Sequence, residues 1–254
     1  MLSEWLLSKT ARNLPNALPL AYAQAQAGLW ARARRCAKAW QAHQVASQNF
    51  LIQQSITVPK RSRVMVLGAG MLGDVPLTHL AATFAHVVLV DVTLLWPTRW
   101  YLRRFANVDY LLHDVTTLAQ QQPAHWQPGF SLPGTADWVI SLNLLSQLPL
   151  LPLAYAQQQG YYLTLDEENQ FITTVCRAHT HALEALPCAV SCLADCRQTT
   201  WQGTNIQADS DFSSVLPRLP GLQTWEWPVV PQGEGEAGTY SLHQVGAWHW
   251  DNTP

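Results

Sequence analysis

Apolar runs alternate along the chain with segments whose apolar residues recur at helical spacing. Five short strands are predicted by apolar runs at residues 63–70, 87–91, 107–114, 136–143 and 188–195. Helices are predicted between them, at residues 74–85, 93–106 and 166–186. Apolar runs without polar alternation are typical of strands in a parallel sheet that is buried on both faces. The order of elements therefore predicts right-handed βαβ units and an α/β fold.

The two ends of the chain depart from this alternation. Residues 18–56 are rich in Ala and Gln, with apolar residues at helical spacing, so we expect residues 1–60 to form an N-terminal helical cap. Residues 222–230 and 239–250 predict two further strands joined as a hairpin. Residues 61–254 are therefore expected to form a doubly wound, Rossmann-like sheet of seven strands, mostly parallel, with a C-terminal antiparallel hairpin.

A glycine-rich turn follows the first predicted strand. Residues 68–73 read Gly-Ala-Gly-Met-Leu-Gly, and Asp91 ends the second predicted strand. Glycines allow a tight turn and the close approach of a ligand to the backbone. A carboxylate at the end of the second strand can accept hydrogen bonds from both hydroxyls of a ribose. The pattern indicates a site for a nucleoside-type ligand, and the alternative is a tight turn with a structural Asp91.

The residues after the glycines bear on which nucleoside is bound. The spacing GxGxxG favours a dinucleotide, but a carboxylate at Asp74 would repel a diphosphate, and Pro76 removes an N–H donor. S-adenosylmethionine has no phosphate, and an acidic loop tolerates its ammonium and sulfonium groups. The alternative role of Asp74 is that of a helix N-cap. No Tyr-x-x-x-Lys pair, which a short-chain dehydrogenase needs, follows the fourth strand.

Residues 61–254 resemble the class I S-adenosylmethionine-dependent methyltransferases. The resemblance is carried by the segments VMVLGAGMLGD, VVLVD, NVDYLLHDVTTL and ADWVISLNLLSQLP and by the C-terminal hairpin. It implies that Gly68, Ala69 and Gly70 form the cofactor loop and that Asp91 binds the ribose. It also implies that Asp114 and the Val115 backbone bind adenine, and that Asn143 lies near the methyl group or the carboxylate of the cofactor.

Two positions depart from the family pattern. The family frequently has an acid where this chain has Val66, and a Gly or Ala where it has Leu72. The expected function is methyl transfer from S-adenosylmethionine to a small molecule or a protein. The segment after the fourth strand reads Asn-Leu-Leu-Ser rather than Asn-Pro-Pro-Tyr, which weakens a nucleic-acid acceptor. An NAD(P)-dependent oxidoreductase and a non-catalytic methyltransferase-like binding domain are the alternatives.

Composition narrows the class of protein. Of 254 residues, 48% are hydrophobic and 13% are charged, with a formal net charge of -2, which excludes a highly charged disordered chain and a global electrostatic grip on nucleic acid. No apolar stretch reaches the ~18 residues that cross a bilayer. Glu4 and Lys9 interrupt any N-terminal signal core. Five cysteines indicate reduced thiols, and we expect a cytoplasmic protein.

Other chemistry-bearing residues have two interpretations each. Trp96, Trp138 and Trp201 are candidates for aromatic faces against a sulfonium, although core packing is favoured. Asp195 is a candidate for facing a substrate, and His113 is expected to point away from Asp114. A basic run on the N-terminal helix is expected to form a solvated face or a docking surface; it consists of Arg32, Arg34, Arg35 and Lys38. Three cysteines are expected to pack as small hydrophobic residues rather than bind a metal; they are Cys188, Cys192 and Cys196.

Overall fold

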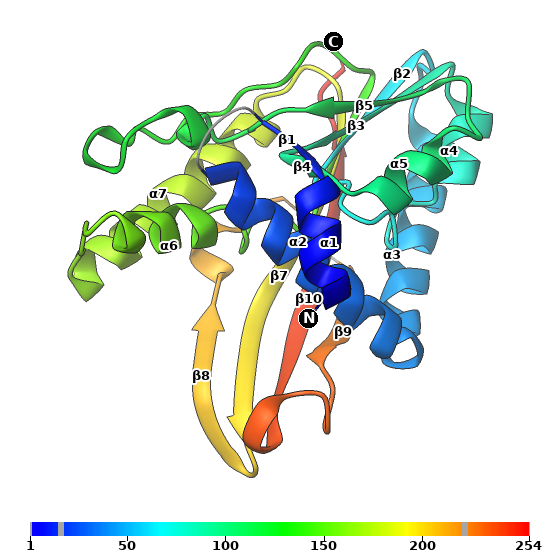
Figure 1. The fold of residues 1–254 in the computed structure, drawn as a ribbon. Coiled ribbons are helices and arrows are strands. Elements are labelled where there is room, and N and C mark those ends of the chain that lie inside the picture. Colours follow the sequence, from blue (N-terminus) through cyan, green and yellow to red (C-terminus); the bar gives the residue numbers. More distant parts are fainter. Residues whose placement is uncertain (1, 15–17, 220–222, 254) are drawn as a thin grey trace.

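The computed structural model describes residues 2–14, 18–219 and 223–253, which form a sheet with helices on both faces (Figure 1). The strands of the sheet are β2 (Arg63–Leu67), β3 (His86–Asp91), β5 (Val108–Leu112), β6 (Trp138–Leu142), β7 (Ala189–Gln202), β8 (Asn205–Asp211), β9 (Gln223–Val230) and β10 (Thr239–Asp251). The helices are α1 (Leu2–Thr10), α2 (Leu18–Arg35), α3 (Ala37–Thr57), α4 (Leu77–Thr83), α5 (Trp96–Leu102), α6 (Leu150–Gln158) and α7 (Leu165–Glu184). A separate two-stranded ladder joins β1 (Arg12–Asn13) to β4 (Thr93–Leu94).

The order of strands confirms the predicted fold. The sheet runs β5-β3-β2-β6-β7-β10-β9, and β8 pairs with β7 beside this path. Neighbours from β5 to β7 are parallel, whereas β10 is antiparallel to both β7 and β9. This is the doubly wound sheet, mostly parallel and closed by an antiparallel hairpin, that the class I methyltransferase resemblance implied.

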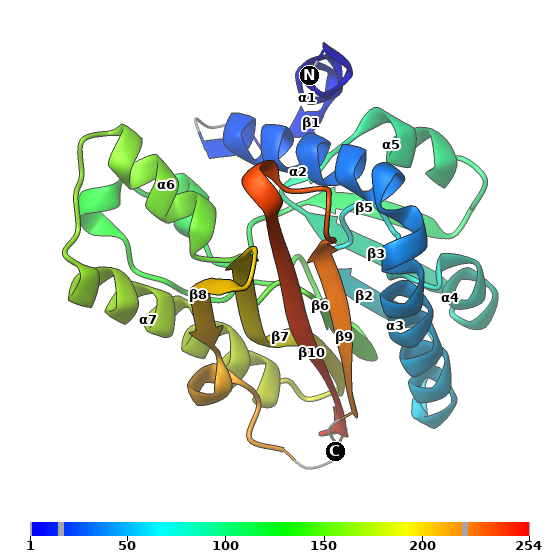
Figure 2. The ribbon, with the colours of Figure 1, turned by 90° about the horizontal axis from the view of Figure 1, so that it is seen from below.

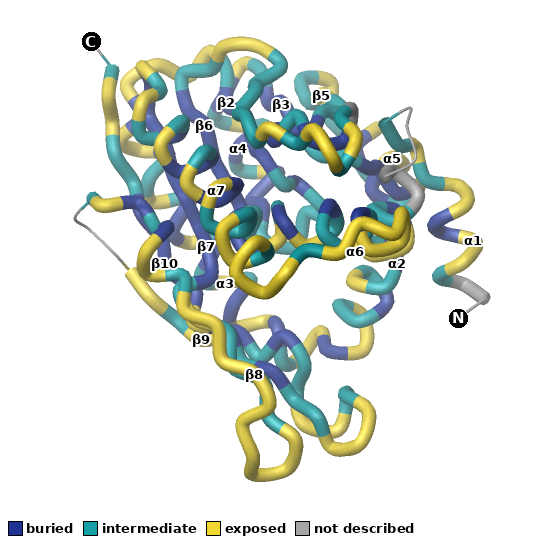
Figure 3. Tube along the Cα trace, turned by 90° about the vertical axis from the view of Figure 1, so that its left-hand side faces the viewer, coloured by how far each residue is buried: buried dark blue, intermediate teal, exposed yellow. Residues whose placement is uncertain are grey.

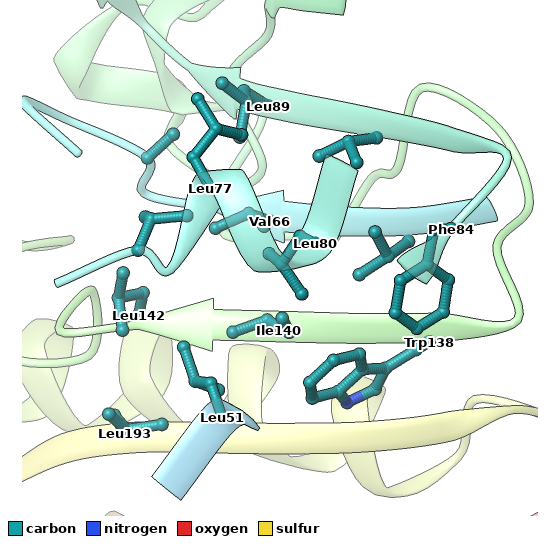
Figure 4. Close-up of a cluster of buried hydrophobic side chains, with 14 of the residues drawn as sticks. Leu51, Val66, Leu77, Leu80, Phe84, Leu89, Trp138, Ile140, Leu142 and Leu193 are labelled. Atoms are coloured by element: carbon teal, nitrogen blue, oxygen red, sulfur yellow. The ribbon is translucent and has the colours of Figure 1, made fainter. Parts of the chain in front are cut away.

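Both faces of the parallel strands are buried, as the apolar runs predicted. Successive residues of β2 divide between two clusters, with Val64 and Val66 in one and Met65 and Leu67 in the other. The first cluster also holds side chains of α3 and α4, and Figure 4 shows part of it around Leu80. The second cluster includes side chains of α7. The period of two in a strand thus supplies both layers of the core.

Local sequence explains where several helices begin. α7 begins with a capping box, in which the Thr164 hydroxyl accepts from the Glu167 N–H at 3.3 Å and the Glu167 carboxylate accepts from the Thr164 N–H at 2.8 Å. The helix predicted over residues 93–106 is shorter, because Thr93 and Leu94 pair with β1 and Pro97 lies in the first turn of α5. Residues 18–56 form two helices rather than one, and they meet at Cys36.

Strand β7 is longer than predicted, and an additional strand follows it. β7 continues to Gln202, and its outer half pairs with β8, which was not predicted. All seven residues of β8 are exposed. Because the strand buries no face, its sequence needs no alternation of apolar residues, and a strand could not be recognised there. Figure 3 shows this contrast between the buried centre of the sheet and the exposed end near β8.

Helices α2 and α3 have different positions relative to the sheet. α2 runs from the side of α6 toward α3, as Figures 1 and 2 show. α3 places Phe50 and Leu51 in the first core cluster. The division of the chain at residue 60 into a cap and a second domain is still a proposal. No helix within the described ranges is long and apolar enough to cross a bilayer.

Candidate functional site

A cavity of about 730 Å³ lies at the carboxyl ends of β2, β3 and β6. The strand order reverses between β2 and β6, and ligands of open α/β sheets bind at such a point. The volume is in the range of small-molecule sites. All the residues assigned to the cofactor from sequence line this cavity, namely Gly68, Ala69, Gly70, Asp91, Asp114, Val115 and Asn143.

Helix α2 forms the wall opposite the strand ends. Tyr22, Gln26 and Leu29 line the cavity at spacings of four and three residues, so they share one face of the helix. Helical periodicity was visible in this part of the sequence, but no motif marked these side chains. Their role in the cavity follows from where α2 lies, which is a tertiary property.

The glycine turn is as tight as its sequence predicted. Gly68 has φ +75° and its N–H donates to the Val90 carbonyl at 2.9 Å. A Cβ built on Gly68 would lie 2.6 Å from Leu144 Cγ and 2.8 Å from the Leu142 carbonyl oxygen. Gly70 has φ +48°. Only glycine therefore fits position 68 without displacing the segment that follows β6.

Asp91 faces this turn from the end of β3. Its carboxylate accepts from the Gly70 N–H at 2.8 Å and from the Val92 N–H at 2.7 Å. Burial raises the pKa of Asp91 to about 6, although the backbone hydrogen bonds oppose the rise. A carboxyl group with a perturbed pKa in a cavity is characteristic of functional sites.

Asp114 has most of its acceptor capacity engaged within its own loop. One carboxylate oxygen accepts from the Thr116 N–H at 2.8 Å and hydroxyl at 2.7 Å, and the other from the Ala119 N–H at 2.7 Å. Tyr22 lies close by, and burial together with the charges of Asp114 and Asp91 raises the pKa of its phenol. His113 also lines the cavity, and its Nε2 lies 3.0 Å from the Ser131 carbonyl oxygen.

Asn143 presents an unpartnered acceptor. Its backbone has φ +50°, and its Nδ2 donates to Asp74 Oδ2 at 3.0 Å. Its Oδ1 is buried and has no hydrogen-bond partner. Asp74 does not cap α4, because the residue at the N-cap is Pro76 and no side chain bonds to the helix end. The N-cap alternative for Asp74 is therefore wrong.

The far wall of the cavity is aromatic. Trp40 and Trp227 line it, with ring centroids 5.2 Å apart in an edge-to-face arrangement. The ring of His43 stacks on Trp227 at 4.1 Å, and its Nε2 lies 3.3 Å from Asp74 Oδ1. His243 of β10 completes this wall. The sequence singled out Trp227, with its period-two neighbour Trp225, as a residue expected to be buried, but it marked none of these four side chains as part of the cavity.

The tryptophans named from sequence lie elsewhere. Trp138 is fully buried in the first core cluster, Trp96 is exposed in the first turn of α5, and Trp201 stacks on Tyr240 in the extended end of the sheet. None of the three lines the cavity. Asp195 is buried beneath the cavity wall, against His243.

The remaining candidates also have defined places. Arg32 and Arg35 of the basic run line the cavity, and Arg35 pairs with Glu234. Cys188, Cys192 and Cys196 lie in or against the second hydrophobic cluster. Within the part of the chain that the structure describes, no cluster of three or more His, Cys, Asp or Glu residues is arranged to hold a metal ion.

Comparisons with known proteins found similarity at the level of fold. No protein-family model and no curated protein sequence matches the chain. The solved N-methyltransferase NodS from Bradyrhizobium japonicum WM9, in complex with S-adenosylhomocysteine, is 11% identical over 79% of this chain and 87% of that one, with a TM-score of 0.35. The 1,6-didemethyltoxoflavin-N1-methyltransferase of Burkholderia thailandensis is 13% identical over 96% and 94%, with a TM-score of 0.37. CalS10 from Micromonospora echinaspora, an amino pentose methyltransferase, is 14% identical over 85% and 96%, with a TM-score of 0.36.

Proposed function

We propose that this protein is an S-adenosylmethionine-dependent methyltransferase whose acceptor is a small molecule or a protein. The observation that carries the proposal is the acidic lining of the glycine turn. Asp74 lines the cavity at the end of this turn, and Asp91 faces Gly70 from the end of β3. A diphosphate on the turn would meet the carboxylate of Asp74, whereas a ligand with ammonium and sulfonium groups is attracted to it.

The start of α4 supports the same choice of ligand. A dinucleotide site uses free N–H groups of a helix that begins directly after the glycines. Here α4 begins at Leu77, after Pro76, and residues between Gly70 and Asp74 are in turns. The helix end is therefore too far along the chain to receive a diphosphate at the glycine turn, which disfavours the NAD(P)-dependent alternative.

The residues of the turn and the strand ends fit the nucleoside part of the cofactor. We assign the backbone of Gly68, Ala69 and Gly70 to the cofactor loop. Asp91 would accept hydrogen bonds from the ribose hydroxyls. On the adenine side, Asp114 keeps acceptor capacity on the oxygen that bonds Ala119, and we assign it and the Val115 backbone to the base.

Asn143 fits the amino-acid end of the cofactor. Its buried, unpartnered Oδ1 is costly unless a donor reaches it. An ammonium group supplies such a donor, and Asp74, which is bonded to the same side chain, supplies a negative charge. We therefore assign Asn143 to the methionine end, as the resemblance implied, with its Oδ1 and Asp74 receiving the ammonium. This contact replaces the family's acid at the position of Val66.

The chain's part in the reaction is alignment in a dry site. The bound cofactor supplies a methyl group on a positively charged sulfur. The strand ends would fix the nucleoside, and Tyr22 of α2 lines the cavity beside them. The acceptor would enter against the aromatic wall of Trp40 and Trp227. Holding the two reactants in line contributes most of what such a displacement requires from a protein.

Titration calorimetry with S-adenosylhomocysteine and NADH tests the proposal. We expect S-adenosylhomocysteine to bind and NADH to give no heat of binding. We also expect Asn143→Leu, which removes the unpartnered acceptor, to weaken S-adenosylhomocysteine by about 1–3 kcal/mol. Asn205→Leu, the same replacement at an exposed residue of β8 that does not line the cavity, is the control and should leave affinity unchanged. NADH binding without a response to S-adenosylhomocysteine would overturn the proposal, and binding of neither would favour a non-catalytic domain.

A further inference from the structure

A histidine–carboxylate pair lies in the cavity wall and has no part in the cofactor assignments. His243 lines the cavity, and its Nδ1 lies 3.1 Å from Asp195 Oδ1. Asp195 is 2% exposed, and its other oxygen accepts from the Ser146 hydroxyl at 2.5 Å and from Gln198 Nε2 at 2.8 Å. The pair is therefore a fixed element, with three groups holding the carboxylate in place.

The carboxylate decides which nitrogen of His243 carries the proton. Asp195 is ionised at neutral pH: burial raises its pKa, but the hydrogen bond and charge of His243 and the bonds from Ser146 and Gln198 outweigh burial and lower it. An ionised carboxylate 3.1 Å away accepts a proton from Nδ1–H, which leaves the lone pair on Nε2. This is the arrangement by which a buried acid orients a histidine base.

The pair is tied to the part of the cavity where the acceptor would lie. Ser146 follows Asn143 by three residues in the segment after β6, so this segment both contacts Asp195 and carries the residue that we assigned to the methionine end of the cofactor. The ring of His243 meets Trp227 edge-to-face, with centroids 5.8 Å apart. His43 covers one face of Trp227, so a flat aromatic molecule would pack edge-to-face against this wall, which would bring a ring substituent toward His243.

We propose that His243, oriented by Asp195, is the general base for the methyl acceptor, and that the acceptor is a flat aromatic molecule bearing a weakly acidic hydroxyl or ring N–H. The inference rests on the proposed function. The acceptor's X–H bond breaks, and its electron pair forms the bond to the methyl carbon. The pair of the broken C–S bond stays on sulfur, which becomes neutral. The proton goes to Nε2 of His243, and the imidazolium is stabilised by Asp195 until water removes the proton.

Several charged or titratable groups lie near His243 and enter any pH measurement. Asp195 faces it from β7. His43 and Asp74 lie beyond Trp227 on the β9 side. Arg32 lines the same cavity from α2. Because these groups can alter a pH profile, the test depends on differences between a His243 variant and a matched control.

His249 supplies that control. It lies on the same strand, β10, outside the cavity, with its ring nitrogens 2.9 Å from the Ser191 hydroxyl and 3.1 Å from the Thr57 hydroxyl. The first measurement is ¹⁵N NMR of the histidine rings in protein saturated with S-adenosylhomocysteine. At pH 7.5 we expect His243 to carry its proton on Nδ1, and its Nε2 signal to move when 2-naphthol is added, while the His249 signals stay. A proton on Nε2, or an unmoved Nε2 signal, would overturn the assignment.

The second measurement separates a base from a structural histidine. Single turnovers are measured with S-adenosylmethionine and two probes of one shape, 2-naphthol, which must lose a proton, and 2-naphthalenethiol, which is largely ionised at pH 8. We expect His243→Asn to slow naphthol methylation about 100-fold or more and to change thiol methylation little. His249→Asn should affect neither. Asp195→Asn should slow naphthol methylation and shift its pH profile, since it acts through His243.

Each other outcome has a definite consequence. Equal slowing of both probes by His243→Asn would mean a structural role and would overturn the base assignment. A wild-type protein that binds S-adenosylhomocysteine but methylates neither probe would overturn the aromatic acceptor class. Failure to bind S-adenosylhomocysteine would overturn the proposed function itself, and the proton position on His243, measured without ligand, would still report on the pair.

Discussion

Replacement of Asp91 by Asn should make the ligand-free protein more stable while it weakens cofactor binding. Burial raises the pKa of Asp91 from 3.8 to about 6, so at neutral pH the folded protein holds a charge that the cavity disfavours. The difference of about 2 pKa units corresponds to about 3 kcal/mol, at 1.36 kcal/mol for each unit. Above about pH 6, the charged carboxylate of Asp91 therefore makes the folded protein less stable by about this amount.

The sign of the pH dependence follows from the direction of the shift. The folded state binds the proton more tightly than the unfolded state, so the contribution of Asp91 to stability is complete below about pH 4. It is lost as the pH rises through about 6. Asn is neutral throughout, but its single oxygen replaces two, and one of the N–H groups of Gly70 and Val92 loses its acceptor. That loss costs about 1–2 kcal/mol, which leaves a net gain of about 1–2 kcal/mol at pH 7.5.

Thermal unfolding with and without S-adenosylhomocysteine measures both effects. At about 2–4 °C for each kcal/mol, Asp91→Asn should raise the melting temperature of the ligand-free protein by about 2–8 °C at pH 7.5 and should not raise it at pH 4.5. The affinity for S-adenosylhomocysteine should fall by about 1–3 kcal/mol. Asp109→Asn, at a carboxylate whose side chain is 66% exposed, should change neither quantity. A lower melting temperature at pH 7.5, or an equal gain at both pH values, would refute the reasoning.

The cavity was predictable because parallel strands bring their carboxyl ends to one edge. Asp91 and Asn143 follow apolar runs of the sequence, and the turn at Gly68 follows another, so topology alone assembles them. Burial on both faces made these runs unusually clear. The prediction required only the presence and order of strands, which hydrophobic pattern reports well.

The aromatic wall was not predictable, because it depends on register between distant strands. His243 pairs with Gln198 in the β7–β10 ladder, and an irregularity between Gln244 and Val245 shifts the register toward Asp195. A shift of one residue would turn His243 to the other face of the sheet. The expectation that Asp195 faces the substrate was close in place, but the carboxylate lies behind His243 rather than in the cavity.

Two further substitutions test the packing and the buried charges. Gly68→Ala should lower the free energy of unfolding by about 2–5 kcal/mol, of which about 1–2 comes from its positive φ and about 1–3 from the clash of the new Cβ with Leu144. Gly160→Ala is the control: Gly160 has φ +78° but open space around it, so the loss should be only the roughly 1–2 kcal/mol that comes from φ. Equal losses in urea unfolding would show that the clash with Leu144 contributes nothing. His179→Gln should remove an acid sensitivity of about 3 kcal/mol. Burial lowers the pKa of His179 from 6.5 to about 4, so the unfolded state binds the proton more tightly, and stability present above pH 6.5 is lost as the pH falls toward 4. This linkage opposes that of Asp91 over nearly the same range, so the two contributions largely cancel in the wild-type protein. Relative to the wild type, urea unfolding should show that Asp91→Asn loses stability and His179→Gln gains stability as the pH falls from 7 to 5. Parallel profiles in all three proteins would show that burial shifts the pKa of neither group.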